Sequence, residues 1–99
     1  MLICENYAEL VSDGLYAIKF GKGSLFSCSI KLWYITGTMN ARDFRKMIKL
    51  IIWACEDPDI ILKALNIIED AFTITIKLSK SAPKNMKYLQ EVKSKYELR

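Results

Sequence analysis

The order of hydrophobic and polar positions divides the chain into a first third typical of β-strands and a remainder typical mostly of helices. Apolar and polar side chains alternate through the first half of residues 25–36, and period-two alternation indicates a strand. The dipeptide Asp13-Gly14 favours a type I′ hairpin turn. A second turn is expected at residues 21–23, where two glycines provide backbone freedom. The predicted strands of this antiparallel meander are residues 7–12, 15–20 and 25–36.

Apolar positions at helical spacing predict two consecutive helices in the middle of the chain. Asn40 is a favourable N-cap, and apolar residues then recur on one face as far as Cys55. Asp57-Pro58 ends this helix and begins a second, because aspartate caps helices and proline fits the first helical position. The second helix is predicted to extend to Ala71, with its polar residues confined to one narrow stripe.

The rest of the chain predicts one more strand and one more helix. Residues 72–78 alternate and are rich in β-branched side chains, which favours a fourth strand. Residues 84–98 place their apolar side chains on one helical face. The element order β-β-β-α-α-β-α therefore predicts a single α+β domain spanning residues 1–99. In this fold an antiparallel β-meander and a fourth strand carry helices packed on one face.

Composition supports a globular domain. Of the 99 residues, 52% are hydrophobic and 26% are charged, so a disordered chain is not expected. No apolar run reaches the roughly 18 residues that a membrane-spanning helix needs. No basic segment precedes an apolar one at the N-terminus, so a signal peptide is not expected. We therefore expect a cytoplasmic protein with no membrane partner.

Residues suited to catalysis or metal binding are few. The sequence has no histidine, and its three cysteines, Cys4, Cys28 and Cys55, are widely spaced, so a zinc site is not expected. The sequence around Gly21 and Gly23 does not match a phosphate-binding loop, because a glycine separates the lysine from the serine and a predicted strand follows. We expect no metal, no cofactor and no enzymatic activity, although the absence of a motif does not by itself exclude an enzyme.

A basic stripe is predicted on the first helix, opposite its apolar face. Four cations fall on it and Trp53 continues it; the cations are Arg42, Arg45, Lys46 and Lys49. Such a stripe suits an acidic protein surface, for which Arg and Trp are typical contact residues. It also suits a nucleic-acid backbone. The third interpretation is a solvated helix face whose Trp53 folds over a neighbouring element.

The C-terminal segment adds further lysines. Lys80, Lys84 and Lys87 would extend a nucleic-acid surface that begins with the four cations of the basic stripe. Alternatively, the C-terminal lysines are solvated, or they pair with the acidic second helix.

Trp33 and Ile35 are apolar residues on the strand face that the predicted helices leave uncovered. Contiguous exposed apolar surface usually marks an interface. Three arrangements would cover these side chains: another element of the same chain, a second copy in a homodimer, or a different protein.

The sequence therefore favours a small interaction protein without catalytic activity. Its size, its Ile- and Lys-rich composition and its lack of an active-site motif are compatible with an accessory protein of a phage or mobile element. Such a protein would bind a larger host or defence complex and inhibit or regulate it. Its partner-binding residues would be Trp33 and Ile35, or the basic stripe with Trp53. The alternative is a nucleic-acid-binding protein.

Overall fold

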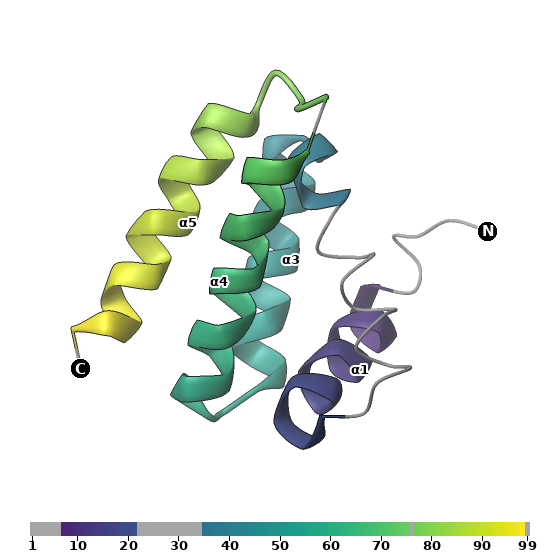
Figure 1. Ribbon diagram of the computed structural model, residues 1–99, viewed down its shortest axis with the longest axis vertical. Coiled ribbons are helices and arrows are strands. Elements are labelled where there is room, and N and C mark those ends of the chain that lie inside the picture. The colour runs from purple at the N-terminus through teal and green to yellow at the C-terminus, as the bar shows by residue number, and fades with distance from the viewer. Residues whose placement is uncertain (1–6, 22–34, 76, 99) are drawn as a thin grey trace.

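The computed structural model describes residues 7–21, 35–75 and 77–98, and within them the chain is helical (Figure 1). Four α-helices are present in these ranges, together with a short 3-10 helix, η2. Their bounds are α1 Tyr7–Phe20, η2 Ile35–Thr38, α3 Ala41–Ala54, α4 Pro58–Ile74 and α5 Ala82–Glu97. None of the described residues lies in a strand. The predicted α+β class with its β-meander is therefore wrong, and the described fold is all-helical.

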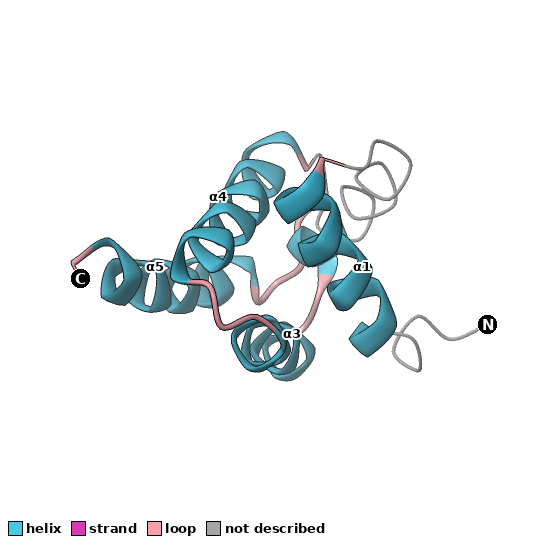
Figure 2. Cartoon of the chain, turned by 90° about the horizontal axis from the view of Figure 1, so that it is seen from below, coloured by secondary structure: helices cyan, strands magenta, loops and turns pink. Residues whose placement is uncertain are grey.

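α3 and α4 run antiparallel, and α1 and α5 lie on opposite sides of this pair (Figures 1 and 2). α1 and α5 each contact both α3 and α4. The apolar faces of all four helices meet in one core, to which α1 contributes Val11 and Leu15. Its largest fully buried apolar side chains include Phe44, Ile51, Leu65, Ile68 and Leu89. The fold is thus stabilised by packing between helices.

The predicted starts of the two central helices are confirmed. The Asn40 side chain accepts a hydrogen bond of 2.8 Å from the backbone N–H of Asp43. The Asp57 side chain accepts one of 2.9 Å from the N–H of Asp59, and Pro58 follows in the first turn. Each cap satisfies a backbone donor that has no partner within its own helix. The predicted apolar face of α3 is also confirmed, since Phe44, Met47, Ile48 and Ile51 are buried.

α1 replaces the first two predicted strands. Asp13-Gly14 lies inside this helix and does not form a hairpin turn. Val11 and Leu15 are buried and Ile18 packs against the core, which is the four- and three-residue spacing of a helix face. Gly21 has a φ of 65°, and its N–H donates to the carbonyl of Ala17 at 2.7 Å. The glycine therefore does provide backbone freedom, but it terminates a helix.

The described parts of the other two predicted strands are not strands either. Residues 72–74 form the last turn of α4, and the described residues between α4 and α5 form a loop. Phe72 is buried in the core and continues the apolar face of α4, which explains why the helix persists. Of the predicted third strand, residues 25–34 lie outside the described residues and the remainder belongs to η2. The last helix is confirmed and begins two residues earlier than predicted.

Candidate functional site

The basic stripe of α3 lies on the outer surface of the molecule. Arg42, Arg45, Lys46 and Lys49 are all exposed. The opposite side of the same helix carries the buried residues Phe44, Met47, Ile48 and Ile51. The stripe is therefore directed away from the core. Arg42, Lys46 and Lys49 have no ion pair within the described part of the chain. These three cations are thus available to a ligand.

Arg45 has a contact within the fold. Its guanidinium carbon lies 5.0 Å from the ring centroid of Tyr88 on α5. The Tyr88 ring in turn makes an edge contact with Phe44, with the two centroids 6.4 Å apart. A cation over an aromatic face is attracted by the negative charge density of the ring. Arg45 therefore links the basic stripe to α5.

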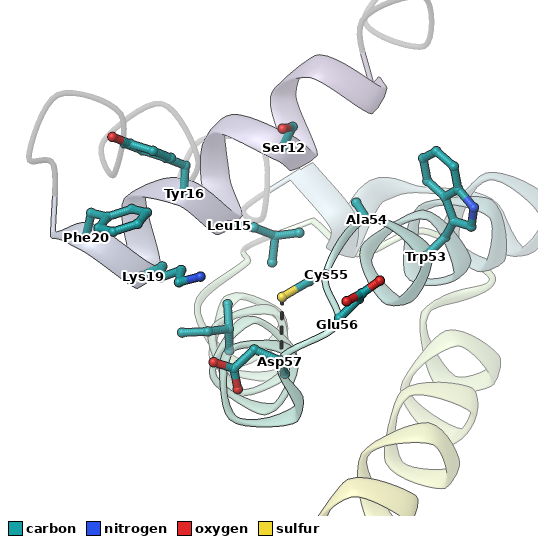
Figure 3. A pocket seen from close by; sticks show the side chains of 11 residues that line it. Ser12, Leu15, Tyr16, Lys19, Phe20, Trp53, Ala54, Cys55, Glu56 and Asp57 are labelled. Atoms are coloured by element: carbon teal, nitrogen blue, oxygen red, sulfur yellow. Dashed lines mark hydrogen bonds between the residues drawn. The ribbon is translucent and has the colours of Figure 1, made fainter.

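Trp53 lies in the last turn of α3, at the end of the stripe, and its side chain is 81% exposed. In this conformation Trp53 does not fold over a neighbouring element. Trp53 also lines an open cleft of about 670 Å³ between α1, the end of α3 and the start of α4 (Figure 3). The indole thus belongs to both features, the stripe and the cleft.

The cleft has an aromatic wall on α1. The Tyr16 and Phe20 side chains project from this helix on the other side of the cleft from Trp53 (Figure 3). Their ring centroids are 4.5 Å apart, and both side chains are about half exposed. Lys19 lies over the Phe20 ring, with Nζ 5.5 Å from its centroid. Sequence reasoning misses these aromatic residues because Asp13-Gly14 predicts a strand over residues 15–20. The helical spacing of Val11, Leu15 and Ile18 is the signal for the helix that carries them.

The floor and the opposite wall of the cleft bring apolar and acidic residues together. Leu15 and Ile60 are buried there, whereas Glu56 and Asp57 from the α3–α4 loop are exposed. Cys55 is half-buried, and its thiol donates to the carbonyl of Asp57 at 3.6 Å. The surface that begins as a row of cations on α3 therefore ends in aromatic, apolar and acidic groups. It can bind a partner by shape and by charges of both signs.

The other predicted site residues are dispersed. Trp33 lies outside the described residues. Ile35 is half-buried in η2 and packs against the core, so it is not part of an open strand face. Lys80 is exposed in the loop before α5, and Lys84 and Lys87 are exposed on the first half of α5. Lys84 is one helical turn before Tyr88, which places it on the flank of α5 that faces the stripe.

One C-terminal lysine pairs with the acidic second helix, as one of the alternatives for this segment predicted. Lys93 Nζ on α5 lies 2.8 Å from Glu69 Oε1 on α4. The flank of α5 that carries Lys93 thus faces α4, whereas the flank that carries Tyr88 faces the basic stripe. The lysines of α5 are therefore divided between two surfaces.

Within residues 7–21, 35–75 and 77–98, no group of three or more Cys, Asp or Glu side chains is arranged to hold a metal ion. In the same ranges, no helix has the length and hydrophobicity that crossing a bilayer requires.

The described fold and surface define a small all-helical protein with a mixed basic and aromatic face. No protein-family model matches the chain, and no curated protein or solved structure shows significant similarity to it. Its function therefore has to be inferred from the surface itself.

Proposed function

We propose that this chain acts by binding another protein through the basic stripe, Trp53 and the adjoining cleft. The observation that supports the proposal is the position of Trp53, whose exposed indole joins the row of cations to the cleft. Trp and Arg are the residue types that most often dominate binding energy at protein interfaces. Partial burial by a partner would remove a large apolar area from water without rearranging the core.

The exposed groups of this surface contribute little to the stability of the chain itself. Isolated surface charges change folding free energies by at most about 1 kcal/mol. Three of the cations have no ion-pair partner in the described residues, and most of the Trp53 side chain is in contact with solvent. Folding stability therefore does not explain why these residues are exposed together, whereas a binding role does.

The charge pattern favours a protein over a nucleic acid. A phosphate backbone presents one sign of charge along its whole length, and affinity for it comes mainly from cations. Here the end of the stripe that carries Trp53 adjoins Glu56 and Asp57, which would repel phosphates. A protein that presents acidic groups to α3 and apolar or basic groups to the cleft matches the complete surface.

The biological setting expected from the sequence is part of this proposal. A chain of 99 residues that occupies the surface of a larger complex would act as a small accessory protein, inhibiting or regulating that complex in the cytoplasm. The size and composition of the chain support this setting, and the surface described above is where the complex would be contacted.

The test is affinity capture from the native host with nuclease treatment, using matched variants. Trp53→Ala removes the indole, and the double variant Lys46→Glu/Lys49→Glu reverses the stripe. Lys63→Glu/Lys95→Glu is the control for the double variant, because both lysines are exposed, the net charge changes equally, and the stripe and the cleft stay intact. The captured protein is then purified and titrated against each variant.

We expect the parent and the control to bind the same protein, and both stripe variants to bind it at least tenfold more weakly. Nuclease treatment should not reduce the capture. Binding that is lost with nuclease, or that is transferred to purified DNA or RNA and falls steeply with salt, would instead establish the nucleic-acid alternative.

A further inference from the structure

A second, separate surface lies on the other flank of α5, where the last turn of α4 meets the first turns of α5. It is an open groove of about 230 Å³. Five of its six lining residues are apolar; the lining residues are Phe72, Thr73, Leu78, Ala82, Pro83 and Met86. Phe72 and Ala82 are buried and form the floor, whereas Leu78 and Pro83 are exposed.

The groove has the size of one large side chain. An apolar protein cavity of about 150 Å³ accommodates benzene, so about 230 Å³ of apolar space fits the side chain of Leu, Phe or Trp. The lining residue Leu78 is 45% exposed, and Ile74, which follows the lining residue Thr73 in the chain, is 56% exposed. An anchoring side chain would therefore find apolar surface both below it and beside it.

The charges around the groove are almost all positive. The sequence between Asp70 and Glu91 contains four lysines and no carboxylate residue. All four lysines are exposed: Lys77, Lys80, Lys84 and Lys87. Lys84 lies on the flank of α5 that faces the basic stripe, so the cations on the groove side are among the other three. Lys77 and Lys80 lie in the same loop as Leu78, and Lys87 is one helical turn after Pro83. The occupant that complements this surface is apolar at its centre and acidic at its ends.

The carboxylates near the groove cancel little of the positive charge of these lysines. Glu69 on α4 is neutralised by Lys93, with 2.8 Å between Nζ and Oε1. Asp70, which is exposed, lies one turn before Thr73 on the outer side of α4. Of the two described carboxylate residues that precede the groove on α4, Asp70 is thus the one without an ion pair.

We propose that this groove binds a short acidic segment of a partner protein that carries one large apolar anchor. Peptides that place apolar side chains in a groove on a helical protein are a common recognition mode, and flanking charges then increase the association rate and the specificity. This inference does not rest on the function proposed above, because the groove shares no residue with the basic stripe or the cleft.

The probe is a displayed library of random 12-residue peptides, selected against the intact chain. The blocking variant is Pro83→Glu, which adds a carboxylate at the groove. Folding should tolerate this change because Pro83 is exposed in the first turn of α5, where a negative charge is favourable. Gln90→Glu is the matched control, with the same charge change on an exposed residue two turns further along α5. Thr73→Glu tests the groove from the α4 side.

We expect the enriched peptides to carry an excess of Asp and Glu around a Leu, Ile, Phe or Trp. Their affinity should fall at least tenfold with Pro83→Glu and with Thr73→Glu, and less than twofold with Gln90→Glu and with Trp53→Ala. Enriched peptides without an acidic excess, or equal binding to the parent and to Pro83→Glu, would overturn the proposal. An absence of enriched peptides would overturn it as well; sedimentation of the parent but not of Pro83→Glu on phosphatidylserine vesicles would then assign the groove to a lipid surface.

Discussion

The side chain of Asn85 on α5 donates a hydrogen bond from Nδ2 to the backbone carbonyl of Met39, with 3.0 Å between the two atoms. Asn85 is 1% exposed, so this contact is made away from water. The same carbonyl accepts a second hydrogen bond, of 2.8 Å, from the Ser79 hydroxyl. Met39 directly precedes the N-cap of α3, so both bonds fix the start of α3 against the segment that leads into α5.

Replacing Asn85 by Ala should therefore lower the free energy of unfolding by about 1–3 kcal/mol, because a buried hydrogen bond is lost and a cavity is left. The measurement is urea denaturation followed by circular dichroism. Asn66→Ala on the exposed face of α4 is the control and should change the free energy by less than about 0.5 kcal/mol. Equal effects of the two substitutions would contradict a structural role for the Asn85 bond.

Gly37 should not tolerate a side chain. A Cβ at this position would lie 2.9 Å from Leu78 Cδ2 and 2.9 Å from Thr75 Oγ1. Gly37→Ala should destabilise the fold by about 1–3 kcal/mol, as overpacking of a close contact does. Thermal unfolding measures the effect.

Leu78→Ala provides the internal check on the Gly37 prediction. In the double variant the clash with Leu78 is absent and the contact with Thr75 remains, so the two substitutions together should destabilise the fold by less than the sum of their single effects. Strict additivity would show that Leu78 does not limit the space at Gly37.

The ion pair between Lys93 and Glu69 should make a modest contribution that decreases with salt. The two side chains are 15% and 28% exposed, so they are partly shielded from solvent. Since exposed pairs are worth about 0.2–1 kcal/mol, we expect a coupling energy near the upper end of that range. A double-mutant cycle with Lys93→Met and Glu69→Gln at low and high salt measures it. A coupling of zero at low salt would show that the 2.8 Å contact does not hold in solution.

The sequence was sufficient to predict the helices whose ends are marked by local chemistry. Asn40, Asp57 and Pro58 satisfy or remove backbone donors at helix starts, and these effects depend only on neighbouring residues. The buried face of α3 follows from its spacing alone. The basic stripe was identifiable for the same reason, because residues opposite a buried face are exposed.

The first helix and the end of α4 were mispredicted because local preferences were outweighed by tertiary packing. Asp13-Gly14 favours a turn and Thr73 favours a strand, yet both lie in helices. α1 buries Val11 and Leu15 in the core, and α4 buries Phe72. Burial of a large apolar side chain contributes about 1.5–3 kcal/mol, which exceeds the roughly 1 kcal/mol that a single propensity contributes.

The cleft could not be predicted, because its residues come from segments that are distant in the sequence. Tyr16 and Phe20 meet the Trp53 end of α3 only after α1 has packed against α3 and α4. A strand prediction for residues 15–20 placed these aromatic side chains in a sheet, which gave no reason for them to lie near the Trp53 end of α3. An error in one element therefore concealed half of the site, whereas the half on the correctly predicted helix was found.

The two aromatic side chains of α3, Phe44 and Trp53, should differ strongly in what their truncation costs the fold. Phe44 is completely buried and its ring contacts Phe72 at a centroid distance of 5.6 Å, so Phe44→Ala should reduce the free energy of unfolding by about 3–5 kcal/mol. Trp53 is 81% exposed, so Trp53→Ala should change it by less than about 0.5 kcal/mol. Chemical denaturation of the three proteins measures both values. If Trp53→Ala destabilised the chain by several kcal/mol, the indole would be packed against the fold in solution and would not be free to anchor a partner.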